Sequence, residues 1–153
     1  MPLLALGTNG ATINSNPVFY SMTADLIGMV EQANETGPTG FLTNATIKRS
    51  ALKLQTTDRE PIPLAELFHD EKVVFSNQVP NNLTKGTGTN LNAIIYGNWQ
   101  SLILAYWSAV DIVINPYADS VASKGGAFLH AFLDADIALR HPESFAICKD
   151  AAP

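Results

Sequence analysis

The stretch Phe128–Cys148, FLHAFLDADIALRHPESFAIC, decides the fold and also contains residues that could form a site. From position 129 to position 139 every odd residue is apolar, whereas the even positions include His130, Asp134 and Asp136. Alternation over about a dozen residues has the period of a half-buried β-strand. A helix would put Asp136 on the apolar side, so the sequence predicts a long strand.

This strand prediction limits the chemistry of the three polar residues. At about 3.3 Å per residue, His130 and Asp134 lie roughly 13 Å apart, too far for one Zn²⁺ ion with ligands at about 2 Å. Asp134 and Asp136 would lie about 7 Å apart. That spacing is compatible with a paired-carboxylate site, although exposed aspartates on a solvated strand are commoner. A small-molecule-binding or hydrolytic α+β domain that uses Asp134, Asp136 and His130 therefore remains an alternative.

The predicted strand is also unusually long. It would extend about 40 Å, whereas strands usually have about five or six residues. Because long exposed edges pair with other chains, we expect an equally long partner strand or a neighbouring molecule.

The composition restricts the class of protein. The chain has 153 residues, 46% hydrophobic and 15% charged, which fits one globular domain or two small lobes. The net charge of −5 and the lack of a basic cluster argue against a sequence-specific nucleic-acid partner. Cys148 is alone, so we expect no disulfide framework and no cysteine-based metal site. The first ten residues have a short apolar run but no basic region before it, so we expect neither a signal peptide nor a membrane span. We also expect no membrane partner.

Helices and strands are expected in an order that indicates an α+β fold. Asn16 as N-cap and Pro17 as first residue predict a helix from Pro17 to about Asn34, ended by TGPTG. Phe41–Thr43 is expected to be a buried strand that leads into a second helix capped by Asn44. The segment TTDREPIP at 56–63 is expected to be an exposed loop, because its prolines break helices.

The second half of the chain is predicted to be mostly strands. A single helical turn is expected at 64–68, NNLTKGTGTN at 81–90 is expected to be a flexible loop, and residues 118–126 another loop. The segments expected to form strands are KVVFSN, NAIIYGNW, SLILAYW and VDIVIN.

Other candidate sites are weak. The glycine-rich segment KGTGTN does not end in the Gly-Lys-Ser or Gly-Lys-Thr sequence of a phosphate-binding loop. His69 precedes Asp70, but no elbow motif supplies a serine nucleophile. Trp99, Tyr106 and Trp107 could line a ligand groove, although aromatic residues in strands are more often core or interface. We therefore expect no catalytic constellation, no cofactor and no metal.

Four segments in order resemble the C-terminal half of tailed-phage major capsid proteins, whose fold is named after phage Hong Kong 97 and is shared with encapsulins. Ala45 stands where that family commonly has proline, and Asn98 replaces a common aspartate, while Pro142, Glu143 and Phe145 match. The matching segments are GFLTNATIKRSALKL (40–54), KVVFSNQVP (72–80), AIIYGNWQSLILAYWSAVDIVINPY (93–117) and AFLDADIALRHPESFAIC (131–148).

The resemblance implies an α+β fold with an axial lobe, a mixed sheet flanked by helices, and part of a peripheral lobe containing the long strand. Residues 1–39 would be a peripheral-lobe segment, 40–117 mainly axial lobe, and 118–153 the long strand and a closing segment that returns to the peripheral lobe. By matching order, the exposed loop would point to the capsomer axis. Its residues are Thr57, Asp58, Arg59, Glu60 and Pro61.

The implied function is structural and not enzymatic: a subunit forming pentamer and hexamer contacts in an icosahedral phage capsid around packaged DNA, or in an encapsulin-like shell. The family's N-terminal arm, extended loop and spine helix precede the matched region. We therefore expect a fragment, either an engineered piece or a degraded prophage gene product, unable to close a shell alone. Implied partners are other copies, with portal and scaffold or protease proteins in the full system. The implied location is the virion capsid, with the bacterial cytoplasm during expression.

Overall fold

The computed structural model describes residues 1–35 and 37–153, which fall into two compact units. Unit 1 comprises Met1–Ser101 and His141–Pro153, and unit 2 comprises Leu102–Arg140. Within the described residues, no helix is both long and apolar enough to cross a membrane. The helices and strands of unit 1 are β1 (Leu3–Leu4), β2 (Ala11–Thr12), α1 (Asn16–Glu31), β3 (Thr39–Thr43), α2 (Ala45–Leu52), α3 (Leu64–Leu67), β4 (Val73–Phe75), β5 (Leu83–Lys85), β6 (Gly88–Asn98) and β11 (Phe145–Ala152).

Unit 1 is built on a mixed sheet in the order β1-β11-β6-β3-β4. Strand β6 runs antiparallel to both β3 and β11, whereas β4 is parallel to β3 and β1 is parallel to β11. Strand β2 adds to β11, and β5 adds to β6. The expected α+β class and mixed sheet are confirmed.

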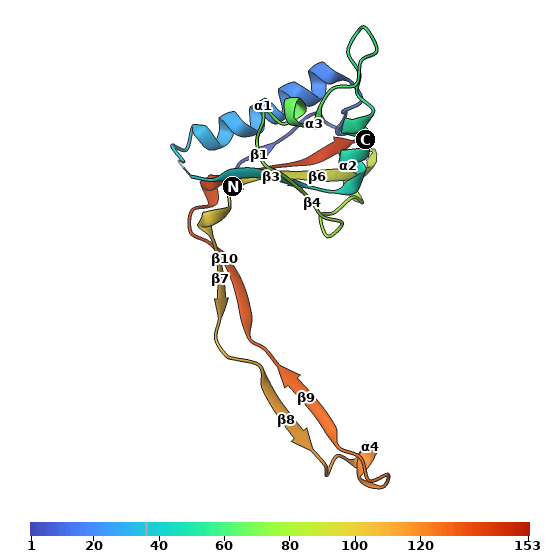
Figure 1. The fold of residues 1–153 in the computed structure, drawn as a ribbon, viewed down its shortest axis with the longest axis vertical. Helices are drawn as coiled ribbons and strands as arrows, with labels where there is room; N and C mark the ends of the chain where they lie inside the picture. Colours follow the sequence, from blue (N-terminus) through green and yellow to red (C-terminus); the bar gives the residue numbers. More distant parts are fainter. Residues whose placement is uncertain (36) are drawn as a thin grey trace. The chain divides into compact units, whose positions relative to one another are not determined.

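Helix α1 packs along one face of this sheet (Figure 1), because one side of the helix is apolar at helical spacing. The predicted helix is confirmed, but the predicted cap is wrong by one residue. The helix begins at Asn16 itself, and Ser15 occupies the capping position without a side-chain hydrogen bond. The side chains that α1 buries are Phe19, Met22, Thr23, Leu26 and Val30.

Helix α2 begins where the sequence predicts, at the cap residue Asn44. The Asn44 Oδ1 accepts a hydrogen bond of 3.0 Å from the Ile47 backbone N–H. The Asn44 amide in turn donates to Asn92 Oδ1 at 2.8 Å, and both side chains are buried. The cap therefore ties α2 to the central strand β6 as well as starting the helix.

Helices α1, α2 and α3 all contribute to the same hydrophobic core with the sheet. Phe68 stands at its centre, with its ring 5.3 Å from that of Phe19 and 5.2 Å from that of Phe41. The buried residues of this core are Ile13, Phe19, Met22, Leu26, Val30, Phe41, Ile47, Ala51, Leu54, Ile62, Leu67, Phe68, Ile94, Tyr96, Ala146, Cys148 and Ala151.

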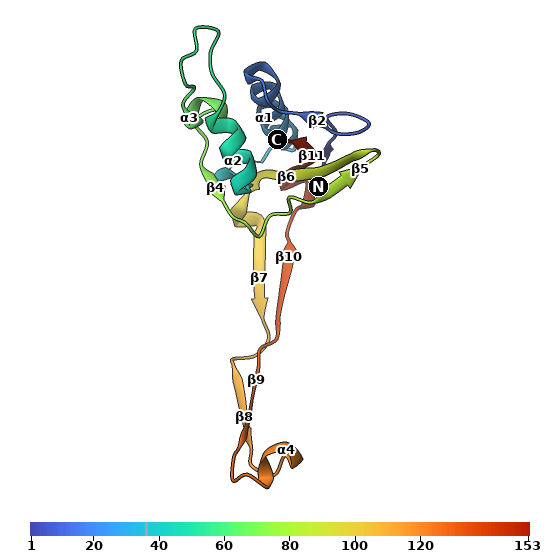
Figure 2. The same cartoon turned by 90° about the vertical axis from the view of Figure 1, so that its right-hand side faces the viewer.

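The prediction of a flexible loop at 81–90 is wrong. Residues 83–90 form β5, a tight turn and the start of β6, which together make an antiparallel hairpin (Figure 2). Gly86 permits the turn, because its φ is +57°. Gly88 lets the Asn9 backbone pass close to the turn, because a Cβ on Gly88 would lie 2.1 Å from the Asn9 carbonyl oxygen. Glycine content alone does not distinguish this use from flexibility.

Unit 2 is a hairpin made of two successive antiparallel ladders (Figure 2). The predicted long strand is wrong in two respects: it is interrupted at 133–134, and its residues are exposed where half-burial was expected. The loop expected at 118–126 contains a single helical turn, α4. The elements of unit 2 are β7 (Leu102–Tyr106), β8 (Asp111–Asn115), α4 (Asp119–Ala122), β9 (Phe128–Phe132) and β10 (Ala135–Leu139).

The interruption has a local cause. Between the two ladders the first strand has four residues and the second has two, so the pairing shifts. The Trp107 N–H donates to the Asp134 carbonyl at 3.0 Å, and the Asp134 N–H donates to Ser108 Oγ at 3.4 Å. The assignment of 1–39, 40–117 and 118–153 to peripheral and axial lobes stays a prediction.

Candidate functional site

The residues of the alternative enzymatic hypothesis do not form a site. His130 on β9 pairs with Val113, Asp136 on β10 pairs with Ala105, and Asp134 lies in the connection between the two strands. Over residues 1–35 and 37–153, no group of three or more His, Cys, Asp or Glu side chains could hold a metal ion. The three residues are therefore spread over β9, β10 and the connection between them, and they do not form a group that could hold a metal ion.

His130 instead belongs to a row of rings on one face of β9. Its ring centre lies 4.3 Å from that of Phe128 and 5.8 Å from that of Phe132, with the latter pair stacked. Residues two apart on a strand share a face, which places these rings in line. The row is a surface feature of the hairpin.

The His69 side chain also has a structural explanation. The His69 Nε2 lies 3.1 Å from Thr23 Oγ1, and its ring lies 4.1 Å from the ring of Tyr20. The Thr23 hydroxyl is fully buried and also lies 3.0 Å from the Leu67 carbonyl oxygen. This contact fixes the segment after α3 onto α1, and the hydroxyl is not available as a nucleophile.

The three aromatic residues proposed as a groove lining are divided between the units. Trp99 Nε1 donates to the Gly40 carbonyl at 3.0 Å, and its ring packs edge-on against Phe145 at 5.3 Å. A groove of about 450 Å³ does adjoin Trp99 in unit 1. Tyr106 and Trp107 belong to unit 2 and are exposed. The groove is lined by Pro38, Thr39, Gly40, Phe41, Leu42, Lys72, Val74, Trp99 and Gln100.

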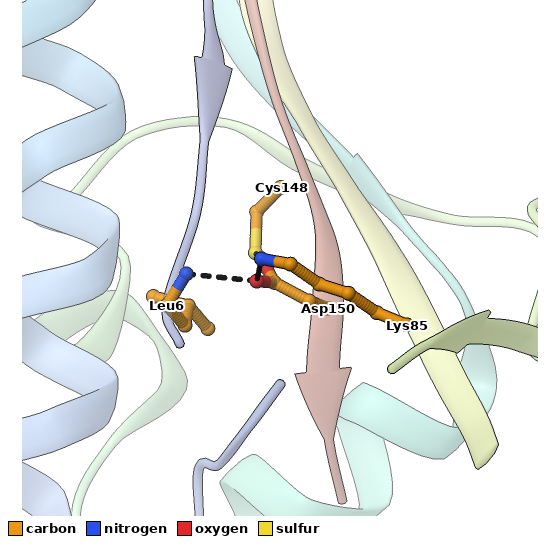
Figure 3. Close-up of polar contacts among 4 residues, drawn as sticks. All are labelled: Leu6, Lys85, Cys148 and Asp150. Carbon is orange, nitrogen blue, oxygen red and sulfur yellow. Dashed lines mark hydrogen bonds and ion pairs between the residues drawn. The ribbon is translucent and has the colours of Figure 1, made fainter. Parts of the chain in front are cut away.

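A polar cluster surrounds the Asp150 carboxylate (Figure 3), and the sequence did not predict it. The Asp150 Oδ2 accepts hydrogen bonds from the Leu6 backbone N–H at 2.8 Å and from Lys85 Nζ at 2.5 Å, and Oδ1 accepts one from Cys148 Sγ at 3.2 Å. No sequence motif signals it, because Leu6 and Lys85 lie 144 and 65 residues before Asp150.

The electrostatics of this cluster favour a structural role. Burial alone would raise the pKa of Asp150, but the hydrogen bonds from Lys85, Cys148 and Leu6 and the charge of Lys85 outweigh it, so the pKa is lowered. Burial raises the pKa of the Cys148 thiol to about 12. A thiol that stays protonated is a poor nucleophile, so the cluster lacks the chemistry of a cysteine active site.

The loop expected at 56–63 is present between α2 and α3, and it is exposed except at Ile62, which packs into the core. It is closed by hydrogen bonds from the Thr56 N–H to the Glu60 carbonyl at 2.9 Å and from the Arg59 N–H to the Thr56 carbonyl at 3.0 Å. Arg59 adopts a left-handed conformation with φ of +65°. Thr57, Asp58, Arg59, Glu60 and Pro61 are all exposed, so the turn presents adjacent charges of both signs to solvent.

The hairpin of unit 2 carries many exposed large apolar side chains on both of its ladders. In the β7/β10 ladder, Leu104 pairs with Ile137, which is 62% exposed. In the β8/β9 ladder, Ile114 pairs with Leu129, and both are more than 60% exposed. Exposed apolar patches of this extent mark surfaces that contact other molecules. The exposed large apolar residues of unit 2 are Leu102, Ile103, Leu104, Tyr106, Trp107, Val110, Ile112, Val113, Ile114, Tyr117, Phe128, Leu129, Phe132, Leu133, Ile137 and Leu139.

Solved structures share this fold. A virus-like particle from Pyrococcus furiosus matches with a TM-score of 0.60 and 15% identity over 97% of this chain and 56% of that chain. The capsid of cyanophage P-SCSP1u matches with a TM-score of 0.59 and 14% identity over 99% and 53%. The SrpI encapsulin complex from Synechococcus elongatus matches with a TM-score of 0.61 and 12% identity over 97% and 52%.

These likenesses confirm the predicted fold, that of the phage Hong Kong 97 capsid protein and the encapsulins. The chain spans about half the length of the solved chains it matches. No family model matches this sequence, and no curated protein matches it.

Proposed function

We propose that this chain is a non-enzymatic structural subunit of a protein shell, in which copies associate into five- and six-membered rings around packaged DNA, as in a tailed-phage capsid. The observation that carries the proposal is the uncovered apolar hairpin of unit 2, in a fold whose solved examples include a phage capsid and a virus-like particle. A two-stranded hairpin is only marginally stable in water. Its apolar side chains would be stabilised by cover from other polypeptide segments.

The hairpin's role in association is tested by two substitutions that each replace exposed apolar surface with a smaller side chain carrying a hydroxyl. Ile112→Thr with Ile137→Thr places one hydroxyl on each ladder at positions that are about equally exposed. We expect the unchanged chain to associate with rising concentration in analytical ultracentrifugation, and the double variant to remain smaller. Leu52→Gln, at an exposed position on α2, is the matched control and should associate like the unchanged chain. Equal association of all three proteins would contradict the proposal that the apolar side chains of the hairpin mediate association.

The charged turn at Thr57–Pro61 is proposed to face the ring axis, where Arg59 of one copy would meet the acidic residues of the next. Its exposure and its adjacent charges of both signs support the proposal. Asp58→Lys should then weaken ring formation, while Glu66→Lys, at an exposed position of α3, should not. Rings that form unchanged in the Asp58→Lys variant would count against an axial loop.

A second candidate, favoured by the likeness to the SrpI encapsulin, is an encapsulin-like shell that encloses a protein cargo. The two shells differ in their contents, so nuclease-protected DNA in purified particles supports the capsid and co-purified protein supports the encapsulin. In the capsid case the location is the virion, reached from the bacterial cytoplasm, and the further partners are portal and scaffold or protease proteins.

A further inference from the structure

We infer that the face of the unit 1 sheet opposite the helices is a docking surface, and that it receives the β7/β10 ladder of a second copy of this chain. The inference rests on the proposed function, in which copies associate through the hairpin, and it names the surface that the hairpin contacts. The contact joins two exposed surfaces of opposite charge, which lie on different units of the chain.

An aliphatic row crosses this face of the sheet. Leu42 pairs with Ile95 on one side and with Val74 on the other. Ile95 pairs with Ile147, which pairs with Leu3. Residues that pair across strands point to the same face, so the five side chains form one line over β4, β3, β6, β11 and β1. At about 4.8 Å between strands, the row extends about 19 Å.

The helices of unit 1 pack on the other face of the sheet. Phe41, Ile94 and Cys148, which alternate with residues of the row, are buried in the core with side chains of α1, α2 and α3. On the row itself Val74 is 48% exposed and Leu3 is 58% exposed, and the three residues between them are half-buried. Within the described part of unit 1, the row is therefore an apolar surface without a covering layer.

The groove beside Trp99 opens on one end of the row. Leu42 and Val74 line it together with Gly40 and Lys72. Trp99 forms one wall, with its Nε1 donating to the Gly40 carbonyl at 3.0 Å, and Gly40 places no side chain in the groove. The row is therefore bordered by a hollow of about 450 Å³, which side chains of a partner can enter.

A lysine stands near each end of the row. Lys72 lines the groove, and Lys149 lines a second pocket with Leu3. Among residues 1–35 and 37–153, neither lysine forms an ion pair. The second pocket already contains the Asp150 carboxylate, which is paired with Lys85, whereas none of the described residues that line the groove is acidic. The charge without a counterpart is therefore that of Lys72, and a matching partner carries a carboxylate.

The β7/β10 ladder presents the complementary surface. Ile103 pairs with Ala138 and Ala105 pairs with Asp136, so these four side chains share one face. Asp136 is exposed and is the one charged residue of β7 and β10. The two alanines leave space for the larger side chains of the row, as in sheets that pack face to face. The face therefore places a carboxylate within an apolar surface, which matches a row that ends at Lys72.

A second copy is the partner that fits, because every chain has both surfaces. Unit 2 is acidic overall, since its four aspartates outnumber Lys124 and Arg140. The two surfaces differ, so the contact is head-to-tail, and the sheet of each copy receives the hairpin of the next. Contacts of this kind close into rings when the rotation between copies allows it, which is the association that the proposed function needs. The opposite face of the ladder, which contains Ile137, remains available for other contacts of a shell.

Cross-linking between two different variants tests the contact directly. One variant carries Val74→Cys on the sheet row, and the other carries Ala138→Cys on the ladder face that holds Asp136. Ala135→Cys is the matched control, because Ala135 is also exposed but pairs with Tyr106 on the opposite face. With a short bis-maleimide, the Val74 and Ala138 variants should give about ten-fold more covalent dimer than the Val74 and Ala135 variants, since docking raises the effective concentration of the thiols.

Three controls fix the meaning of this result. The chain without an added cysteine measures the background from Cys148, which is fully buried. Leu52→Cys, at an exposed position of α2, should give no excess dimer with Ala138→Cys. A single chain with both Val74→Cys and Ala138→Cys, studied at high dilution, detects docking of the chain's own hairpin. Internal closure of that chain without excess dimer between the two single variants would overturn the inference.

Charge reversal tests the pairing of Lys72 with Asp136. Adding Asp136→Lys to the Ala138 variant should lower the yield of dimer about five-fold, because like charges then meet. Adding Lys72→Glu to the Val74 variant should have the same effect. With both reversals present, one in each variant, the yield should return. An unchanged yield in all three mixtures would overturn the inference, because charge complementarity is what selects the partner.

The outcomes separate this inference from the proposed function. If the unchanged chain associates in analytical ultracentrifugation but the Ala138 and Ala135 variants give equal amounts of dimer, the hairpin contacts another surface and only the inference is wrong. If the unchanged chain does not associate at any concentration, both the inference and the proposed function are wrong.

Discussion

Replacing Asn44 with alanine should destabilise unit 1 far more than the loss of one helix cap. The Asn44 side chain is 2% exposed and makes two kinds of contact. Its oxygen accepts the Ile47 N–H at 3.0 Å, and its amide donates to Asn92 Oδ1 at 2.8 Å and to the Pro80 carbonyl at 3.3 Å. The variant Asn44→Ala removes all three hydrogen bonds.

The expected magnitude follows from these contacts. Loss of a helix N-cap costs about 1 kcal/mol. The Asn92 oxygen would then be buried without its donor, and an unsatisfied buried acceptor costs about 1–3 kcal/mol. The Pro80 carbonyl keeps the Ala93 N–H at 3.2 Å, so it adds little. Together the free energy of unfolding should fall by about 2–4 kcal/mol.

Urea unfolding of the unchanged chain and the variant measures this difference, with Asn44→Asp as the second substitution. Aspartate is a good N-cap, but when ionised it cannot donate to Asn92. The pKa of the introduced carboxyl should therefore be raised, so the variant should be least destabilised relative to the unchanged chain below about pH 4, and this difference in stability should grow as the pH rises through the raised pKa. A loss of less than about 1 kcal/mol in Asn44→Ala, with Asn44→Asp as stable as the unchanged chain at neutral pH, would refute the buried-network reasoning.

Three further predictions concern unit 1. Phe68→Ala empties the centre of the core, between the rings of Phe19 and Phe41, and should lower the free energy of unfolding by about 3–5 kcal/mol in urea titrations; a loss near zero would contradict the packing. The lowered pKa of Asp150 means that its stabilisation is present above about pH 4 and is lost as the pH falls through the folded-state pKa. Asp150→Asn should remove that part of the acid dependence, and an unchanged acid profile would count against the cluster. Burial raises the pKa of Cys148 to about 12, so its labelling by a thiol reagent at neutral pH should require opening of the structure; labelling as fast as free cysteine would contradict this burial.

Local features of unit 1 were predictable from the sequence because they depend on neighbouring residues. The spacing of apolar residues predicts α1, and Asn44 before a helical pattern predicts the start of α2. The prolines after α2 predict the exposed turn. Each of these signals acts within a few residues, so the rest of the chain does not alter it.

Unit 2 was predicted less well, since the period of a strand reports which side chains share a face and not what covers that face. Alternation over 129–139 correctly indicates extended chain, yet the residues are exposed and the pairing shifts at 133–134. The shift depends on the number of residues in the opposite strand, which no pattern within 129–139 contains.

The Asp150 cluster and the glycine-rich turn could not be predicted from the sequence for a different reason. Asp150 is explained by Leu6 and Lys85, which are distant along the chain. Gly86 and Gly88 are explained by Asn9, which packs against their turn. A residue whose partner is set by the tertiary fold has no local signature, so such sites become visible only once the strands are placed.

The proposed shell function is tested most directly by native mass spectrometry of the chain over a concentration series, with negative-stain images of the same samples. The account predicts assemblies of five or six copies that appear as rings and grow in abundance with concentration. A chain that stays monomeric at every concentration, or that forms a compact dimer independent of concentration, would contradict the claim that these residues carry ring-forming contacts.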